Sequence, residues 1–268
     1  MTGRRIALGN NKGGVGKSGA VVNLAASLAE AGRTVLVVDM DPQANASRRL
    51  GRPYRPENPT VTVSEVIRSG ETGAAADAIV PCGWDGIYSL RIDVIPSRFD
   101  LENRISEAAA TGAKRRLTRA LDGVDDRYDV TLLDCPPSLG HLTQLALSAA
   151  DWGLALVEPE YDGVEGATRF RDFMADSETL ADIGNDHLRF LAAVPSKVDA
   201  RLGGHTHHLG TLPAIFGPDL VWDPLPQRSV IKDAADEALP LSAMGSRATE
   251  ARAAYDATAL RLWKEITA

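Results

Sequence analysis

Short apolar runs recur along the chain, separated by stretches in which apolar residues have helical spacing. Runs rich in β-branched residues predict buried strands, and apolar positions three or four residues apart predict helices. The predicted strands cover residues 6–9, 34–38, 91–95, 129–133, 153–157 and 188–194. The predicted helices cover about residues 19–31, 101–121, 141–149, 167–180 and 247–266.

The order of these elements predicts the fold. Strands alternate with helices, which indicates βαβ units, right-handed crossovers and a parallel sheet. The unbroken run at 34–38 is typical of a strand covered on both faces. We therefore expect an α/β fold with a mostly parallel, twisted sheet between two layers of helices. Residues 51–59 and 74–86 lack periodicity, and we expect residues 1–268 to form a single domain because no repeat or linker divides them.

Composition narrows the class of protein. The 268 residues are 44% hydrophobic and 24% charged, as in ordinary globular proteins. The net charge of -7 argues against a protein that coats nucleic acid over its whole surface, although a local basic patch remains open. No apolar run reaches the ~18 residues of a membrane span. Cys82 and Cys135 have no metal-like spacing, and we expect a reduced, cytoplasmic protein.

The segment 11–18, Asn-Lys-Gly-Gly-Val-Gly-Lys-Ser, lies between the first strand and the first helix. Glycines there leave backbone N–H groups free to converge on a phosphate chain, and the following helix points its positive end at the anion. Lys17 is placed to bind the β and γ phosphates of ATP, and the Ser18 hydroxyl to bind Mg²⁺. The predicted nucleotide-binding residues are Lys12, Gly13, Gly14, Val15, Gly16, Lys17, Ser18 and Gly19.

Two positions depart from the simple phosphate-loop pattern. Asn11 occupies the place of its first glycine, and Lys12 adds a second lysine at the mouth of the loop. A charge at the mouth cannot easily fold back onto the γ phosphate of its own nucleotide. We expect Lys12 to reach the phosphates of a facing subunit, and we count it with Lys17 among the catalytic residues.

Acidic residues follow two of the predicted strands. Asp39 ends the second strand, with Asp41 two residues later, and Asp134 follows the strand at 129–133. In α/β sheets the ligand-binding groups project from the carboxyl ends of the strands. Asp134 is predicted to hold Mg²⁺ through water, Asp39 to support the water shell of the metal, and Asp41 to orient or deprotonate the attacking water.

These motifs together resemble the deviant Walker A family of P-loop ATPases, and within it the ParA group of DNA-partition proteins. The resemblance rests on the blocks 12–18, 39–43 (Asp-Met-Asp-Pro-Gln) and 134–140 (Asp-Cys-Pro-Pro-Ser-Leu-Gly). It implies Mg²⁺-dependent ATP hydrolysis and a sandwich homodimer formed on ATP, with each Lys12 reaching the nucleotide of its partner. It also implies non-specific DNA binding, stimulation by a ParB-like centromere-binding protein, and association with the nucleoid.

The resemblance adds three details. It places the adenine near Pro226, and relatives carry a hydroxyl residue at the position of Gly19, where it touches the α phosphate. The absence of that hydroxyl would weaken nucleotide binding by roughly 1.5–3 kcal/mol. Because the first strand begins at Ile6, no separate N-terminal DNA-binding module is expected.

Basic residues offer candidate DNA contacts. They cluster at 48–52, at 114–119 and at 169–171, and single ones follow in the last third of the chain. Because ParA-like dimers bind DNA through that last third, we predict phosphate contacts from Arg201, Arg228 and Lys232. The histidine-rich stretch 203–208 has no carboxylate or cysteine at ligand spacing, and we expect it to be a loop rather than a metal site.

Other members of the family remain alternatives. A MinD-like, membrane-tethered ATPase would need a basic amphipathic tail, whereas residues 255–268 carry only two basic residues, balanced by two acidic ones. An ATPase that positions a protein cargo would share every catalytic residue. An amidoligase, a reductase with an iron–sulfur cluster and a non-enzymatic nucleotide sensor complete the alternatives. The cysteines do not suit the cluster, and Lys17, Ser18, Asp41 and Asp134 speak against the sensor.

Overall fold

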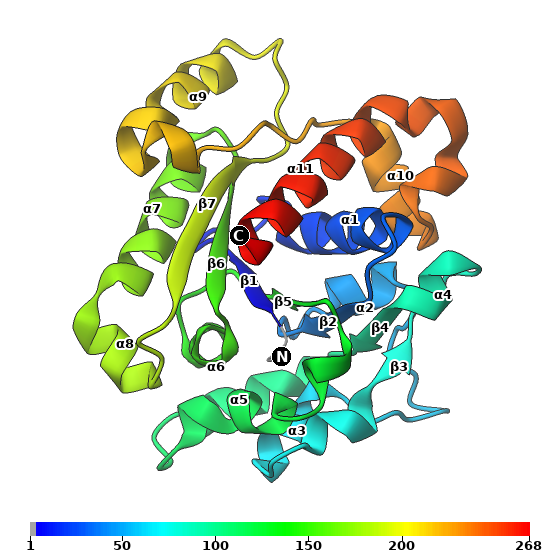
Figure 1. The fold of residues 1–268 in the computed structure, drawn as a ribbon, viewed down its shortest axis with the longest axis vertical. Coiled ribbons are helices and arrows are strands. Elements are labelled where there is room, and N and C mark those ends of the chain that lie inside the picture. Colours follow the sequence, from blue (N-terminus) through cyan, green and yellow to red (C-terminus); the bar gives the residue numbers. More distant parts are fainter. Residues whose placement is uncertain (1–3) are drawn as a thin grey trace.

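The computed structural model describes residues 4–268 and shows the predicted α/β architecture (Figure 1). The seven strands form one sheet in the order β3-β4-β2-β5-β1-β6-β7, in which all pairs are parallel except β3 with β4. The strands are β1 (Arg5–Gly9), β2 (Val35–Asp39), β3 (Val80–Pro81), β4 (Ile92–Ile95), β5 (Val130–Asp134), β6 (Trp152–Val157) and β7 (Arg189–Pro195).

Helices cover both faces of the sheet. The α-helices are α1 (Lys17–Glu30), α2 (Asn45–Arg49), α3 (Val63–Ser69), α4 (Ile87–Arg91), α5 (Arg116–Leu121), α6 (His141–Ala149), α7 (Tyr161–Ala175), α8 (Ser177–Ile183), α9 (Gly203–Phe216), α10 (Ser229–Glu237) and α11 (Thr249–Thr267). Figure 1 shows α1 and α11 on one face and α5, α6 and α7 on the other.

Successive side chains of the central strands point to opposite faces of the sheet, and each face packs into its own hydrophobic core. On β1, Ile6 and Leu8 pack with α1 and α11, whereas Ala7 faces the layer that contains α6 and α7. The strands are therefore buried on both faces, as their unbroken apolar runs predict. Helix α11 belongs to this core, since Tyr255, Leu262 and Ile266 are buried in the cluster with α1, whereas Leu260 is exposed. Among residues 4–268, no helix combines the length and the hydropathy that a membrane crossing requires.

Three predicted segments differ from the structure. The stretch 101–121 forms 3-10 turns, and only α5 is regular, because Gly112 adopts a left-handed backbone (φ 70°) and interrupts it. The helix expected at 167–180 begins earlier and is divided into α7 and α8 at Asp176, whose side chain caps α8 by accepting from Thr179 N. The predicted loop at 203–208 is wrong, because these residues open α9.

A buried histidine explains the start of α9. His205 is only 5% exposed, and its Nδ1 accepts a hydrogen bond from the backbone N of Asp199 (3.1 Å). Leu212 and Phe216 are buried further along the same helix. Glycine, threonine and proline within α9 mask this pattern in the sequence.

Candidate nucleotide site

The phosphate loop follows β1, the strand between β5 and β6, and its first polar residue fixes its position. The amide of Asn10 is buried and donates from Nδ2 to the carbonyls of Leu156 (2.6 Å) and Gly163 (3.0 Å). The backbone N of Asn11 donates to the carbonyl of Gly166 (3.2 Å). A Cβ on Gly166 would lie 2.2 Å from Oδ1 of Asn10, so only glycine lets α7 approach the loop this closely.

The glycines of the loop have the backbone that a phosphate cradle requires. Gly14 (φ 82°) and Gly16 (φ 91°) adopt left-handed conformations, which side chains rarely tolerate. Helix α1 begins directly after Gly16, so its unpaired N–H groups and positive dipole end face the loop. Val15 is fully buried, and its carbonyl accepts a hydrogen bond from the Ser196 hydroxyl (2.7 Å). The loop is thus anchored to Ser196 through its buried residue Val15, while its glycines line an open cavity.

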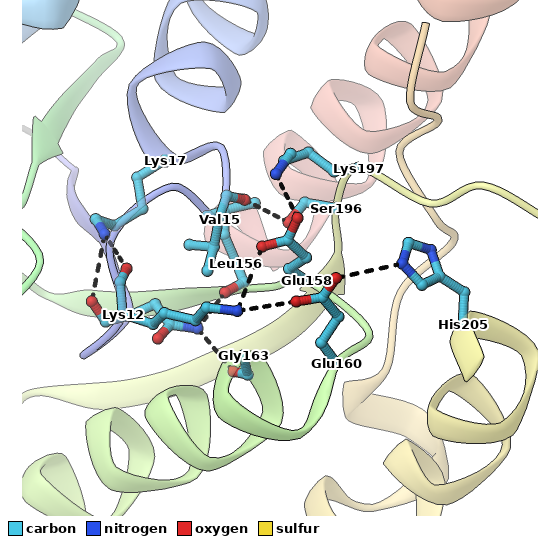
Figure 2. A network of polar contacts seen from close by, with 11 residues as sticks. Lys12, Val15, Lys17, Leu156, Glu158, Glu160, Gly163, Ser196, Lys197 and His205 are labelled. Carbon is cyan, nitrogen blue, oxygen red and sulfur yellow. Dashed lines mark hydrogen bonds and ion pairs between the residues drawn. The ribbon is translucent and has the colours of Figure 1, made fainter. Parts of the chain in front are cut away.

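The two lysines of the loop point in different directions, as Figure 2 shows. Lys17 is 7% exposed, and its Nζ donates to the backbone carbonyls of Lys12 (2.8 Å) and Asn10 (3.3 Å). Burial lowers the pKa of the Lys17 ammonium, and the nearby carboxylates of Asp134 and Asp41 oppose that shift. An ammonium held in this way over the loop can bind the anionic phosphates of a nucleotide.

Lys12 instead extends away from the loop toward acidic residues that follow β6. Its Nζ lies 3.1 Å from Oε2 of Glu160 and 3.6 Å from Oε2 of Glu158. Glu158 also pairs with Lys197, and Glu160 lies near His205 (Figure 2). Hydrogen bonding to Glu160 and the charges of both acids raise the pKa of Lys12 despite partial desolvation. The side chain of Lys12 therefore remains charged and lies outside the phosphate cradle.

The predicted acids meet at the carboxyl ends of neighbouring strands. Asp39 on β2 and Asp134 on β5 are register partners, and the backbone N of Met40 donates to the carbonyl of Asp134 (3.0 Å). Both carboxyl groups are fully buried. Burial raises the pKa of Asp39 to about 6, and burial together with the charge of Asp39 raises that of Asp134 well above its usual value.

The two buried acids differ in their partners. Asp39 accepts hydrogen bonds from the hydroxyl (2.7 Å) and backbone N (2.8 Å) of Ser47 and from the backbone N of Asp41 (3.1 Å). By contrast, no hydrogen bond of ordinary geometry reaches either oxygen of Asp134 from residues 4–268, although the Ser18 hydroxyl lies close enough to lower the pKa of Asp134 slightly against the effect of burial. A buried carboxyl without donors is costly unless a cation or bound water satisfies it. Asp134, with the nearby Ser18 hydroxyl, therefore fits a hydrated Mg²⁺ ion, and Asp39 primarily anchors the segment that contains Ser47.

Asp41 faces a cavity above the phosphate loop. A cavity of about 150 Å³ lies over the loop and is lined by Gly13, Gly14, Gly16, Lys17, Ser18, Gly19, Asp41, Asn45, Arg49 and Pro137. The carboxylate of Asp41 accepts from the backbone N of Gln43 (2.9 Å) and retains a free oxygen. Burial raises its pKa, whereas Gln43 and Lys17 act in the opposite direction. Its place beside Lys17 and Ser18 suits a group that orients water.

The remaining predicted site residues lie further from the loop. Pro226 forms an isolated bridge with Val198, two residues after Ser196, so it lies on the segment next to the loop support. Arg201, Arg228 and Lys232 are exposed. Arg201 pairs with Asp199 (2.6 Å), and Arg228 donates to Glu250 (2.9 Å).

Sequence reasoning missed several residues that shape the site. Asn10, Ser47 and Ser196 hold backbone groups, and single polar residues of this kind have no distinctive pattern. Arg49 appeared only as one member of a basic cluster. Its approach to the loop depends on the packing of α2, which no local pattern reveals.

Comparison with known proteins identifies the family. Residues 3–188 match a family described as an AAA domain. The chain is 36% identical over 231 residues to the chromosome-partitioning ATPase Soj of Thermus thermophilus, covering 86% of this chain and 84% of that protein.

Two solved structures share the fold. A variant of McdA from Cyanothece, solved as a complex with ATP, superposes with a TM-score of 0.81 at 21% identity, covering 96% of each chain. Cobyrinic acid a,c-diamide synthase of Mycobacterium smegmatis, solved with an ATP analogue and magnesium, gives 0.77 at 29% identity over 98% of this chain and 96% of that one. With its phosphate loop and strand-end acids, the chain belongs to the ParA/MinD/Soj-like family of P-loop ATPases.

Proposed function

We propose that this protein is a DNA-partition ATPase whose ATP-bound form is a sandwich homodimer that binds DNA without sequence preference. A ParB-like, centromere-bound partner then stimulates hydrolysis and release, and the ATP-bound protein associates with the nucleoid in the cytoplasm. The relative of 36% identity, named a chromosome-partitioning ATPase, supports this role.

The placement of Lys12 is the observation that carries the proposal. Its ammonium lies outside its own phosphate cradle and next to the exposed start of α7, where Tyr161 is 70% exposed. A charged lysine in this position contributes to ATP hydrolysis if a second subunit presents a nucleotide to it. We infer that each Lys12 leaves Glu158 and Glu160 and completes the site of its twin.

The chemistry follows from the groups around the cavity. Lys17 and the loop N–H groups bind the phosphates, and Asp41 orients or deprotonates the attacking water. Mg²⁺, held by Ser18 and by Asp134 through water, would neutralise phosphate charge, and Asp39 would support that shell. These roles predict Mg²⁺-dependent hydrolysis. Pro226 is proposed to contact the adenine.

The proposed DNA surface lies on adjoining segments. The stretch 198–202 follows the bridge between Val198 and Pro226, so Arg201 and Arg228 come from neighbouring segments of the chain. Lys232 lies one turn beyond Arg228 on α10. Contacts of this kind neutralise phosphates and make binding depend strongly on salt.

A DNA-binding assay with ATP, ADP and no nucleotide tests the proposal. A random-sequence duplex should bind tightly only with ATP, and Lys12→Ala should abolish that difference. Replacing Arg201, Arg228 and Lys232 by alanine should reduce the slope of log affinity against log salt, by roughly one unit for each phosphate that is no longer neutralised. Equal DNA binding in all three nucleotide states would refute the switch.

A cargo-positioning ATPase is the second candidate, because it would have the same nucleotide site. DNA is preferred to a lipid surface as the matrix, since α11 packs most of its apolar side chains against α1, although Leu260 on the same helix is 72% exposed. An ATP-dependent affinity for vesicles of anionic lipid that exceeds the affinity for DNA would favour the MinD-like alternative.

A further inference from the structure

Arg49 lies beside the phosphate loop. It is the last residue of α2, and it lines the cavity that also contains Lys17, Ser18 and Asp41. A Cβ built on Gly19 would lie only 3.1 Å from its Nη1. The guanidinium therefore occupies the space that a side chain at position 19 would need.

This guanidinium has no partner within the described part of the chain. Its Nε is buried without an acceptor, and burial lowers the pKa of the guanidinium, although the charge of Asp134, which lies beyond hydrogen-bond distance, partly opposes that shift. Its neighbour Arg48, by contrast, is exposed and donates to the carbonyl of Ala235 (3.4 Å). Partial burial of an unpaired charge is unfavourable unless a ligand satisfies it. Because this positive charge lines a cavity, the expected ligand is an anion.

Buried hydrogen bonds fix the helix that presents Arg49. Asp39 accepts from both the hydroxyl and the backbone N of Ser47, two residues before Arg49. The hydroxyl of Ser47 also accepts from the backbone N of Ser97 (2.9 Å). Through these hydrogen bonds Asp39, at the end of β2, holds α2 against the sheet and helps to fix the position of Arg49 beside Gly19.

We propose that Arg49 binds the phosphate chain of the nucleotide and takes over the contact that Gly19 cannot make. A guanidinium can donate two parallel hydrogen bonds to phosphate oxygens, so one arginine more than replaces one hydroxyl. The small residue at 19 and the large residue at 49 then form one functional pair. This inference depends on nucleotide binding alone and is independent of the proposed DNA and partner binding.

The test compares the affinity of single variants for a non-hydrolysable ATP analogue with Mg²⁺, measured by calorimetry. Arg49→Ala should weaken binding about tenfold to hundredfold, the range for removal of hydrogen bonds to a charged group. Arg49→Lys, which keeps the charge but loses the fork, should weaken it less. Arg48→Ala is the matched control and should remain within about twofold of the wild type.

The pairing with Gly19 gives a second readout. Gly19→Thr alone should weaken binding, because the new side chain crowds the Arg49 guanidinium. On the Arg49→Ala background the same threonine should improve binding, because it restores a phosphate contact in the vacated space. Such a reversal of sign within a double-mutant cycle requires direct coupling between the two positions.

Melting temperatures separate ligand binding from a structural role. Without nucleotide, Arg49→Ala should melt at or above the wild-type temperature, since the guanidinium has no partner to lose. The rise in melting temperature on adding the ATP analogue should shrink. The proposal is overturned if Arg49→Ala binds the analogue as tightly as Arg48→Ala, or if its nucleotide-free form is destabilised while the ligand-induced rise is unchanged.

Discussion

The proposed release of Lys12 from Glu158 and Glu160 can be tested by weakening one of these ion pairs. Glu160→Gln keeps the shape of the side chain at the start of α7 but removes the charge 3.1 Å from the Lys12 ammonium. The glutamate does not cap α7 through its side chain, so the helix should be unaffected. If Lys12 must leave this pair to reach a second subunit, the variant should dimerise more tightly with ATP.

The size of the effect follows from exposure. The side chain of Glu160 is 53% exposed and that of Lys12 is 24% exposed, so water and salt screen the pair. Exposed ion pairs contribute about 0.2–1 kcal/mol. Since a dimer releases two such pairs, dimerisation should strengthen by about 0.4–2 kcal/mol, or roughly twofold to thirtyfold in its dissociation constant. Glu158 still holds Lys12, which keeps the effect at the lower end of this range.

Sedimentation velocity with a non-hydrolysable ATP analogue and Mg²⁺ measures that constant. Glu165→Gln is the matched control, because it removes the same charge from the same helix but from a pair with Arg169. The control should match the wild type. A Glu160→Gln protein that dimerises more weakly than the control would show that Glu160 supports the dimer instead of retaining Lys12.

Three further outcomes are expected. Lys17→Ala should abolish measurable nucleotide binding, at least a hundredfold loss, since the only ammonium aimed into the described cradle is removed. Asp41→Ala should bind ATP nearly as well as the wild type but hydrolyse it at least a hundredfold more slowly, which a phosphate-release assay checks. Burial and nearby Lys114 lower the pKa of His141, so the contribution of His141 to folding stability should fall as the pH drops below about 6.5, whereas the buried acids Asp39 and Asp134, whose pKa values are raised, contribute in the opposite direction. His141→Leu should remove that pH dependence of the melting temperature, while replacement of the exposed His187 should not.

Below the pKa of His141 in the unfolded chain, the unfolded chain binds a proton on His141 more readily than the folded chain does, so acid favours unfolding at this residue. Neither ring nitrogen of His141 has a hydrogen-bond partner among the described residues. A difference in melting temperature between the wild type and His141→Leu that stays constant from pH 7.5 to 5.5 would contradict this interpretation. Loss of nucleotide binding in Asp41→Ala would show that Asp41 supports binding and is not a water-orienting residue.

The sequence predicts the sheet and the phosphate loop well, because both depend on short, contiguous signals. Apolar runs locate β1, β2 and β5, and the acids at the ends of β2 and β5 then meet because parallel strands finish at one edge. The division at Asp176 and the helix that begins at Gly203 depend on capping and on a single buried histidine, which periodicity does not capture.

Within the site, the sequence does not predict the contacts between segments that are distant along the chain. Lys12 and Glu160 are 148 positions apart, and Gly19 meets Arg49 only because Asp39 holds Ser47. Each residue alone suggests a solvated charge or a permissive turn. Tertiary packing gives them their roles.

A structure of the protein with a non-hydrolysable ATP analogue and Mg²⁺ tests the central claim most directly. We predict a dimer in which the Lys12 ammonium of each subunit has left Glu160 and lies within hydrogen-bond distance of the phosphates bound to the other subunit. A nucleotide-loaded monomer in which Lys12 still pairs with Glu158 and Glu160 would contradict the proposed switch.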